Sequence, residues 1–111
     1  MSKLVVVLVT APRNASEDLA RALLDDKLAA CVNIVGPVRS LYWWQGKVER
    51  DEEDLLIIKT KDCLINTIKR KIKELHPYTV PEIVVLKPVD VLEEYESWAI
   101  SETRTCGGDE Q

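Results

Sequence analysis

Two long β-patterned stretches joined by a two-residue turn constrain the fold of this chain more than any other feature. Residues 31–44 are rich in apolar and β-branched side chains, and residues 47–60 contain the apolar run Leu55-Leu56-Ile57-Ile58. Gln45-Gly46 lies between the two stretches. Glycine supplies the positive φ that such a tight hairpin turn needs. The turn predicts three cross-strand pairs: Trp44 with Lys47, Trp43 with Val48, and Tyr42 with Glu49.

The first part of the chain predicts a strand followed by a helix. Leu4 to Val9 is an apolar, β-branched run, typical of a central strand buried on both faces. An amphipathic pattern follows, with Asn14 or Ser16 as candidate cap and an end near Leu28.

The part of the chain after the hairpin predicts a helix, a strand and a further helix. A helix capped by Asp62 ends at Pro77, with Ile65, Ile68, Ile72 and Leu75 as its buried stripe. A strand is predicted over 83–86. A third helix opens at Asp90 and runs to about Glu102.

The predicted order is strand, helix, strand, strand, helix, strand, helix. The first six elements match the ferredoxin-like split βαβ arrangement, an α+β fold with two helices on one face of a four-stranded antiparallel sheet. A doubly wound nucleotide-binding fold is disfavoured, since the turn after the first strand contains no glycine. We predict one domain over residues 1–103 and a disordered tail over 104–111.

The predicted hairpin is longer than a compact domain of this size. Its first strand, from Cys31 to Trp44, spans roughly 45 Å, whereas a domain of about 100 residues is roughly 35 Å across. Gly36-Pro37 interrupts that strand at a predicted bend or bulge. We expect the hairpin to overhang and interpret Tyr42, Trp43 and the adjoining tryptophan as an oligomer interface, with a ligand-stacking platform as the alternative.

Composition and charge exclude several function classes. The 15 Lys+Arg against 19 Asp+Glu give a net charge of -4, which disfavours nucleic acid as a partner. The longest apolar run is shorter than a membrane helix or a signal-peptide core. We therefore expect a cytoplasmic protein without a membrane partner. No nucleophile elbow or phosphate-binding glycine loop is present in the sequence, so we expect no enzymatic activity.

The three cysteines, Cys31, Cys63 and Cys106, are odd in number and widely spaced. That pattern disfavours a disulfide framework and a structural zinc site. Cys31 has apolar neighbours, so we interpret it as a small buried hydrophobe, with metal ligation as the alternative. Cys63 lies in the first turn of a predicted helix, where the helix dipole favours a thiolate.

Two further segments carry titratable groups. His76, at a predicted helix end, either complements the helix dipole or ligates a metal, and the sequence leaves both open. The acidic run 49–54 is interpreted as a solvated strand edge, with a cation site as the alternative. Strand alternation places Glu49, Asp51 and Glu53 on one face, so the six residues cannot all converge.

Six segments, in this order, closely resemble the CutA divalent-cation tolerance family. They are Thr10-Ala11-Pro12, 28–34 (LAACVNI), 40–47 (SLYWWQGK), 57–60 (IIKT), 76–83 (HPYTVPEI) and 95–98 (YESW). The likeness covers roughly residues 4–102. It implies a homotrimer of ferredoxin-like subunits around a threefold axis, similar in architecture to the PII-type nitrogen-regulatory trimers.

The resemblance also implies a link to divalent-metal tolerance, with copper as the ion and no established reaction. His76 and Cys31 are the metal ligands that it implies here. Some members carry a cysteine just before the Thr-Ala-Pro motif and a second histidine before His-Pro-Tyr. This chain has Val9 and Leu75 at those positions, so we expect weaker copper binding, with His76 as the main ligand.

A ligand pocket between subunits is expected where the resemblance is concentrated. Lys59 follows four apolar residues, so we expect a buried stem and an ammonium paired with Glu49 or Glu82, either in the pocket or as a structural ion pair. The pocket residues are Tyr42, Glu49, Lys59, His76, Tyr78, Glu82 and Trp98, and the interface residues are Trp43 and Trp44. The alternative function is a PII-like signalling module that binds a small ligand in these clefts.

Overall fold

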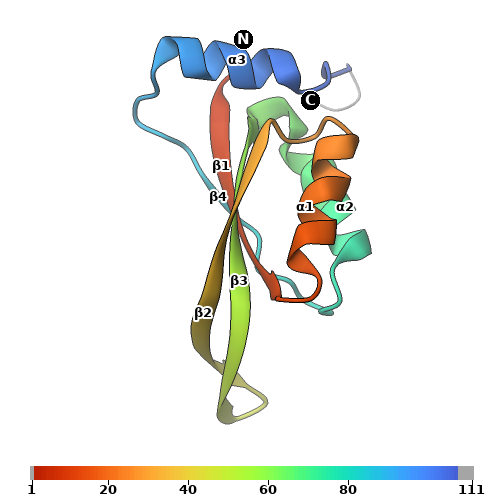
Figure 1. Cartoon of the computed structure of the whole chain (residues 1–111), viewed down its shortest axis with the longest axis vertical. Coiled ribbons are helices and arrows are strands. Elements are labelled where there is room, and N and C mark those ends of the chain that lie inside the picture. Colours follow the sequence, from red (N-terminus) through yellow and green to blue (C-terminus); the bar gives the residue numbers. More distant parts are fainter. Residues whose placement is uncertain (1, 108–111) are drawn as a thin grey trace.

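The computed structural model describes residues 2–107 and contains one four-stranded antiparallel sheet in the order β2-β3-β1-β4. Helices α1 and α2 cover one face of the sheet, and α3 crosses one end of it (Figure 1). The strands are β1 (Leu4–Pro12), β2 (Cys31–Trp44), β3 (Lys47–Lys61) and β4 (Val84–Leu86). The helices are α1 (Ser16–Asp25), the 3-10 turn η1 (Asp62–Leu64), α2 (Ile65–Leu75) and α3 (Glu93–Glu102). The predicted α+β fold is confirmed.

The hydrophobic core lies between the helices and one face of β1 and β3. Its fully buried members include Val7, Val9, Leu23, Leu56, Ile58, Ile68 and Ile72. On the opposite face of β1, Val6 and Leu8 are only half-buried. The prediction of a strand buried on both faces therefore holds for one face, because α3 covers only the end of the other (Figure 1).

The hairpin has the predicted turn and register. Trp44 pairs with Lys47, and the pairing continues along both strands until a register shift between Val35 and Val38. Gln45 and Gly46 have φ values of 50° and 81°, as a two-residue turn of this kind requires. The longest dimension of the molecule is 44 Å, and Figure 1 shows the hairpin extending beyond α1 and α2, so the overhang is confirmed.

A buried carboxylate anchors the base of the hairpin to the start of α1. Asp54 accepts hydrogen bonds from Ser16 Oγ at 2.6 Å and Arg13 Nε at 3.2 Å. A Cβ at Gly36 would lie 1.8 Å from Asp54 Oδ1, so only glycine fits at this bulge. The predicted cap at Asn14 or Ser16 is wrong: the N-cap residue is Ala15, and the Ser16 hydroxyl is used by Asp54 instead.

The other helix ends also differ from prediction. The predicted Asp62 cap is wrong, because the N-cap residues of η1 and α2 are Lys61 and Leu64 and neither makes a side-chain cap hydrogen bond. Asp62 is the first residue of η1, and its carboxylate accepts a hydrogen bond from Cys63 N–H. Leu75 is 47% exposed, because α2 is ending there, and does not belong to the buried stripe. The N-cap of α3 is Leu92, since the Asp90 side chain bonds the next backbone N–H instead. No helix among residues 2–107 is long and apolar enough to cross a membrane.

The expectation against a disulfide is wrong. Cys63 and Cys106 are bonded, with their Cα atoms 6.1 Å apart and a sequence separation of 43. The wide spacing of the cysteines in sequence does not indicate that the chain after α3 returns to η1, just before α2. The Arg104 N–H also donates to Lys27 O at 2.8 Å. Residues 104–107 therefore differ from the predicted disordered tail, and 108–111 lie outside the described residues.

Candidate functional site

An open groove of about 730 Å³ lies between the half of the hairpin nearer its turn and the loop after α2. We call it the hairpin groove. Its lining residues are Thr10, Arg39, Ser40, Leu41, Tyr42, Trp44, Glu53, Pro77, Tyr78, Thr79, Val80 and Glu82. Three predicted ligand residues, Tyr42, Tyr78 and Glu82, thus share one site, and Glu49 is the cross-strand neighbour of Tyr42.

Two phenol–carboxylate pairs define the electrostatics of the hairpin groove. Tyr78 Oη donates to Glu53 Oε2 at 2.9 Å, and Tyr42 Oη donates to Asp51. Burial, together with the bond to Glu53, raises the pKa of Tyr78 well above its usual range. The hydrogen bond to Asp51 raises the pKa of Tyr42 to about 12. The groove therefore offers neutral hydroxyls and carboxylates, which suit hydrogen bonding to a polar ligand.

His76 is buried behind this groove, at 6% exposure. Its Nε2 lies 2.8 Å from Thr10 O, and its Nδ1 accepts a hydrogen bond from Tyr78 N–H at 3.1 Å. A carbonyl can only accept, so these partners assign the proton to Nε2. Both ring nitrogens are thus occupied by backbone groups, and the imidazole ties the loop after α2 to β1.

A second group of predicted residues lies at the other end of β2. Lys59 Nζ is 3.8 Å from Cys31 Sγ. Burial raises the pKa of Tyr95, with a smaller contribution from the neighbouring Cys31, and the Tyr95 and Trp98 ring centroids are 5.6 Å apart. We call Cys31, Lys59, Tyr95 and Trp98 the Cys31 cluster.

The predicted single pocket is therefore two sites within one chain. Cys31 and Tyr42 are separated by roughly 35 Å along the same strand, so the Cys31 cluster and the hairpin groove do not touch. Lys59 is half-buried as expected, but its neighbour is Cys31 and not Glu49 or Glu82.

No three His, Cys, Asp or Glu side chains converge as a metal site within residues 2–107. The acidic run alternates as predicted, since Glu49 and Asp51 face the same side as Tyr42 and Ser40. Glu53 and Asp54 are buried, however, at 5% and 6% exposure. The solvated strand edge thus describes the earlier acids of the run and not these two, which bind Tyr78 and Ser16.

The hairpin tip presents large apolar side chains to solvent. Trp43 is 75% exposed, Trp44 50% and Leu41 66%. Strand alternation puts Trp43 and Leu41 on one side of the hairpin and Trp44 on the other, next to Tyr42. Both sides of the tip therefore offer apolar contact area.

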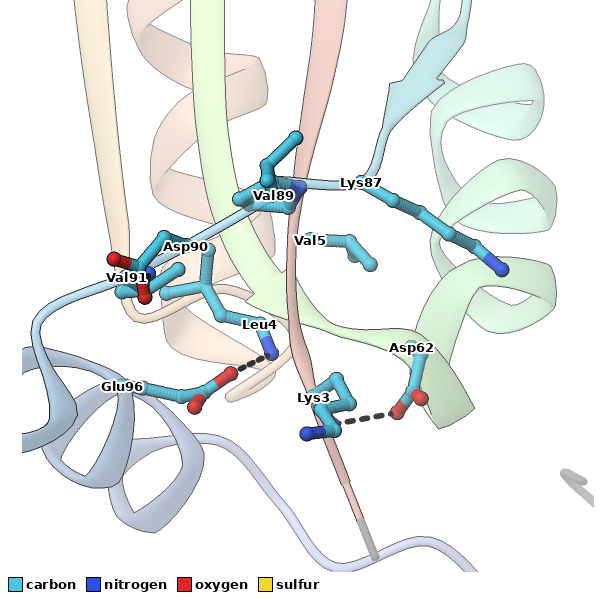
Figure 2. A pocket seen from close by; sticks show the side chains of 10 residues that line it. Lys3, Leu4, Val5, Asp62, Lys87, Val89, Asp90, Val91 and Glu96 are labelled. Carbon is cyan, nitrogen blue, oxygen red and sulfur yellow. Dashed lines mark hydrogen bonds between the residues drawn. The ribbon is translucent and has the colours of Figure 1, made fainter.

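A smaller pocket of about 320 Å³ lies between the start of β1 and the chain entering α3 (Figure 2). In it Leu4 N–H donates to Glu96 Oε2 at 2.9 Å, and Lys3 N–H donates to Asp62 Oδ1 at 3.1 Å. Both carboxylates satisfy backbone groups of β1. We interpret this pocket as the joint that holds α3 and η1 to the sheet.

Sequence reasoning missed several of the residues that complete these sites. Arg39 and Glu53 line the hairpin groove, and Tyr95 completes the Cys31 cluster. Glu53 was detectable, because it alternates onto the same face as Glu49. Tyr95 lies within one of the segments that carry the family resemblance, whereas nothing in the local sequence marks Arg39.

Comparison with known proteins places residues 5–102 within the model of one family, CutA1 divalent ion tolerance protein. The divalent-cation tolerance protein CutA of Thermus thermophilus is 47% identical over 94 residues, covering 84% of this chain and 91% of that protein. The chloroplastic protein CutA 1 of Oryza sativa is 44% identical over 101 residues, 90% of this chain and 57% of the relative. The chain thus spans little more than half of that plant protein.

The fold matches a solved relative closely. The PII-like protein CutA from Nostoc sp. PCC 7120, in its apo form, superposes with a TM-score of 0.86 at 36% identity. The match covers 90% of this chain and 97% of that one. The family is described by tolerance to divalent ions and not by a reaction. Sequence, fold and the extent of these matches agree: this chain belongs to the CutA1 divalent ion tolerance family.

Proposed function

We propose that this chain acts as a homotrimer in divalent-cation tolerance, without catalysing a reaction. The observation that carries the proposal is the uncovered apolar face of the sheet. Leu8 and Ile57 are half-buried there, and Val35, Val84 and Leu86 are 43–47% exposed. An exposed apolar face, on a chain whose hairpin tip also exposes Trp43 and Trp44, is typical of a surface that contacts another protein.

The strand order supports a closed ring. Strands β2 and β4 are the two edges of the sheet, and their unpaired backbone groups are available to a neighbouring subunit. A contact between different edges of adjacent subunits is heterologous, and it closes into a ring when the rotation is right. Three copies around an axis would cover the open face of each sheet, which is the architecture that the family resemblance implies.

Native mass spectrometry of protein purified without added metal tests the assembly. We expect the mass of three chains at micromolar concentration, with concentration-dependent dissociation on dilution. A stable monomer at the same concentration contradicts the proposal. Sedimentation equilibrium over a hundredfold range of concentration separates a trimer from non-specific association, because only the trimer gives one fixed stoichiometry.

The donor side chains of a single chain are not arranged to bind copper. Both nitrogens of His76 are hydrogen-bonded, and the Cys31 sulfur lies beside the Lys59 ammonium, which repels a cation. The donors of one chain therefore do not fit a copper site. We propose that copper binding by this chain depends on Cys31 and on assembly, and not on His76.

Copper titration of three proteins tests this proposal. We expect His76→Ala to leave the isotherm unchanged while lowering stability, because the imidazole holds a loop. We expect Cys31→Ser to abolish saturable binding, since thiolate is a soft ligand that binds copper, above all Cu(I). A lost isotherm in His76→Ala protein that is still folded and trimeric contradicts the proposal and returns the histidine to the metal site.

A second candidate function rests on the hairpin groove. Its volume, its two phenol–carboxylate pairs and the neighbouring Arg39 and Glu82 favour a small polar ligand, as in a PII-like signalling module. The same mass spectra distinguish the functions. A bound mass that survives a chelator and disappears in Glu82→Gln protein supports the ligand module. A bound mass that the chelator removes supports direct metal binding.

A further inference from the structure

Three segments distant in sequence meet near the end of α3. They are the turn after α1, the start of α2 and residues 103–107, and Figure 1 shows the ends of all three helices side by side there. The disulfide between Cys63 and Cys106 joins two of these segments. Both cysteines are half-buried and pack against the edge of the hydrophobic core.

The segment after α3 is held by different means before and after Arg104. Thr103 is buried, its Oγ1 donates to Ala99 O at 3.1 Å, and its carbonyl accepts from Lys61 Nζ at 3.5 Å. The Arg104 N–H donates to Lys27 O. Within the described part of the chain, no backbone hydrogen bond from residues 105–107 accompanies these. The disulfide is what ties residues 105–107 to the helix layer.

The disulfide is placed for exchange with an external thiol. Thr105 and Gly107, on either side of Cys106, are exposed. The fully buried core residues lie on β1, β3, η1, the two core helices and the turn after α1, and none of them follows Thr103. Opening the bond therefore leaves the core in place. The exposed residues on both sides of Cys106 give a reductant access to the bond, as in the labile class of disulfides.

We propose that Cys63–Cys106 is a redox-controlled clasp, opened by exchange with a dithiol reductant of the thioredoxin class, which releases residues 105–107 from the folded domain. A thiolate of the reductant attacks Cys106 Sγ, the sulfur–sulfur bond breaks, and Cys63 leaves as a thiolate that takes up a proton. The second thiol of the reductant then displaces Cys106 as a thiol. Two electrons and two protons pass from the dithiol to the clasp, and the reductant becomes a disulfide.

Trypsin reports on the clasp because it cleaves after Arg104, directly before the residues 105–107 that the disulfide holds. The unmodified full chain is treated with or without dithiothreitol under native conditions, then digested briefly. Each digest is quenched and fully reduced before its mass is measured, since an intact disulfide would keep the fragment 105–111 attached after cleavage. We expect cleavage after Arg104 to be at least tenfold faster in the reduced protein.

Two variants serve as matched controls. Cys106→Ser removes the clasp, so its cleavage is expected to be fast with or without dithiothreitol. Cys31→Ser removes only the free cysteine, so its cleavage is expected to keep the full response to reductant. Alkylation with N-ethylmaleimide counts the thiols: one in the oxidised chain and three in the reduced chain.

Three outcomes overturn the proposal. If Cys63 and Cys106 stay oxidised in dithiothreitol under native conditions, the disulfide is a permanent structural bond. Equal cleavage rates in the two redox states mean that the bond does not hold residues 105–107. A loss of far-ultraviolet circular dichroism on reduction means that the bond stabilises the whole fold and is not a local clasp.

Discussion

Both faces of the sheet carry apolar residues, but the faces differ in what covers them. On the helix face, Val7 and Val9 are completely buried. On the opposite face, Val84 and Leu86 of the adjoining strand remain 43% and 47% exposed. One chain supplies helices for only one face. An apolar run on both faces of a strand is typical of a strand covered on both sides, and within residues 2–107 helices α1 and α2 cover one face of the sheet (Figure 1).

The largest expected effect separates the two faces at neighbouring residues of β3. Ile58 is fully buried against the helices, whereas Ile57 is half-buried on the open face. Ile58→Ala should lower the free energy of unfolding by about 2–5 kcal/mol, because it leaves a cavity in the core. Urea denaturation measures this loss.

Ile57→Ala is the matched partner of that substitution. If copies of the chain cover the open face, its cost should appear as weaker assembly, with a melting temperature that depends more strongly on protein concentration. An equal, concentration-independent loss for both variants would mean that no partner covers the open face.

The next effect concerns the hairpin tip. Replacing both Trp43 and Trp44 by Ser should weaken the assembly by at least about 2 kcal/mol, since buried aromatic anchors carry much of an interface's energy. The folded monomer should be unaffected, because both side chains are at least half exposed in the single chain. Sedimentation measures the shift, and an unchanged trimer would place the interface elsewhere.

The hairpin shows what local sequence can predict. The turn at Gln45-Gly46 and the pairing of Trp44 with Lys47 follow from a few adjacent residues, because strand geometry propagates register from a tight turn. The bulge at Gly36 is signalled by its own dipeptide, although its reason, the approach of Asp54, is not.

The sites show what local sequence does not predict. The bond between His76 and Thr10 O joins residues 66 apart, and the disulfide joins residues 43 apart. Neither partner carries a local signal of the other. Within one chain the predicted pocket residues lie in two places, because adjacency of motifs in sequence says nothing about position along a strand, and the pocket between subunits stays a prediction. Lys59 pairs with Cys31, whose strand runs on for roughly 35 Å before it reaches Tyr42.

A smaller effect concerns the hydrogen bond that joins the loop after α2 to the hairpin. Tyr78→Phe removes the hydrogen bond to Glu53, a buried carboxylate. We expect a loss of about 1.5–3 kcal/mol in the free energy of unfolding, the usual range for a hydrogen bond to a charged group. Tyr42→Phe is the control, because its partner Asp51 is exposed, and its cost should be smaller. Equal costs would show that burial of the carboxylate does not matter here.

The smallest effect is an alkaline one, and it involves all three tyrosines, Tyr42, Tyr78 and Tyr95. Each has its pKa raised in the folded chain, that of Tyr42 to about 12, whereas an unfolded tyrosine ionises near pH 10. The folded chain therefore holds protons that the unfolded chain has lost. The stabilisation from these phenols is fully present below about pH 10 and declines as pH rises through the folded pKa values. Absorbance at 295 nm should show the native chain forming phenolate later than the chain unfolded in urea. A native titration near pH 10 for all three rings would contradict the phenol–carboxylate pairs of the hairpin groove.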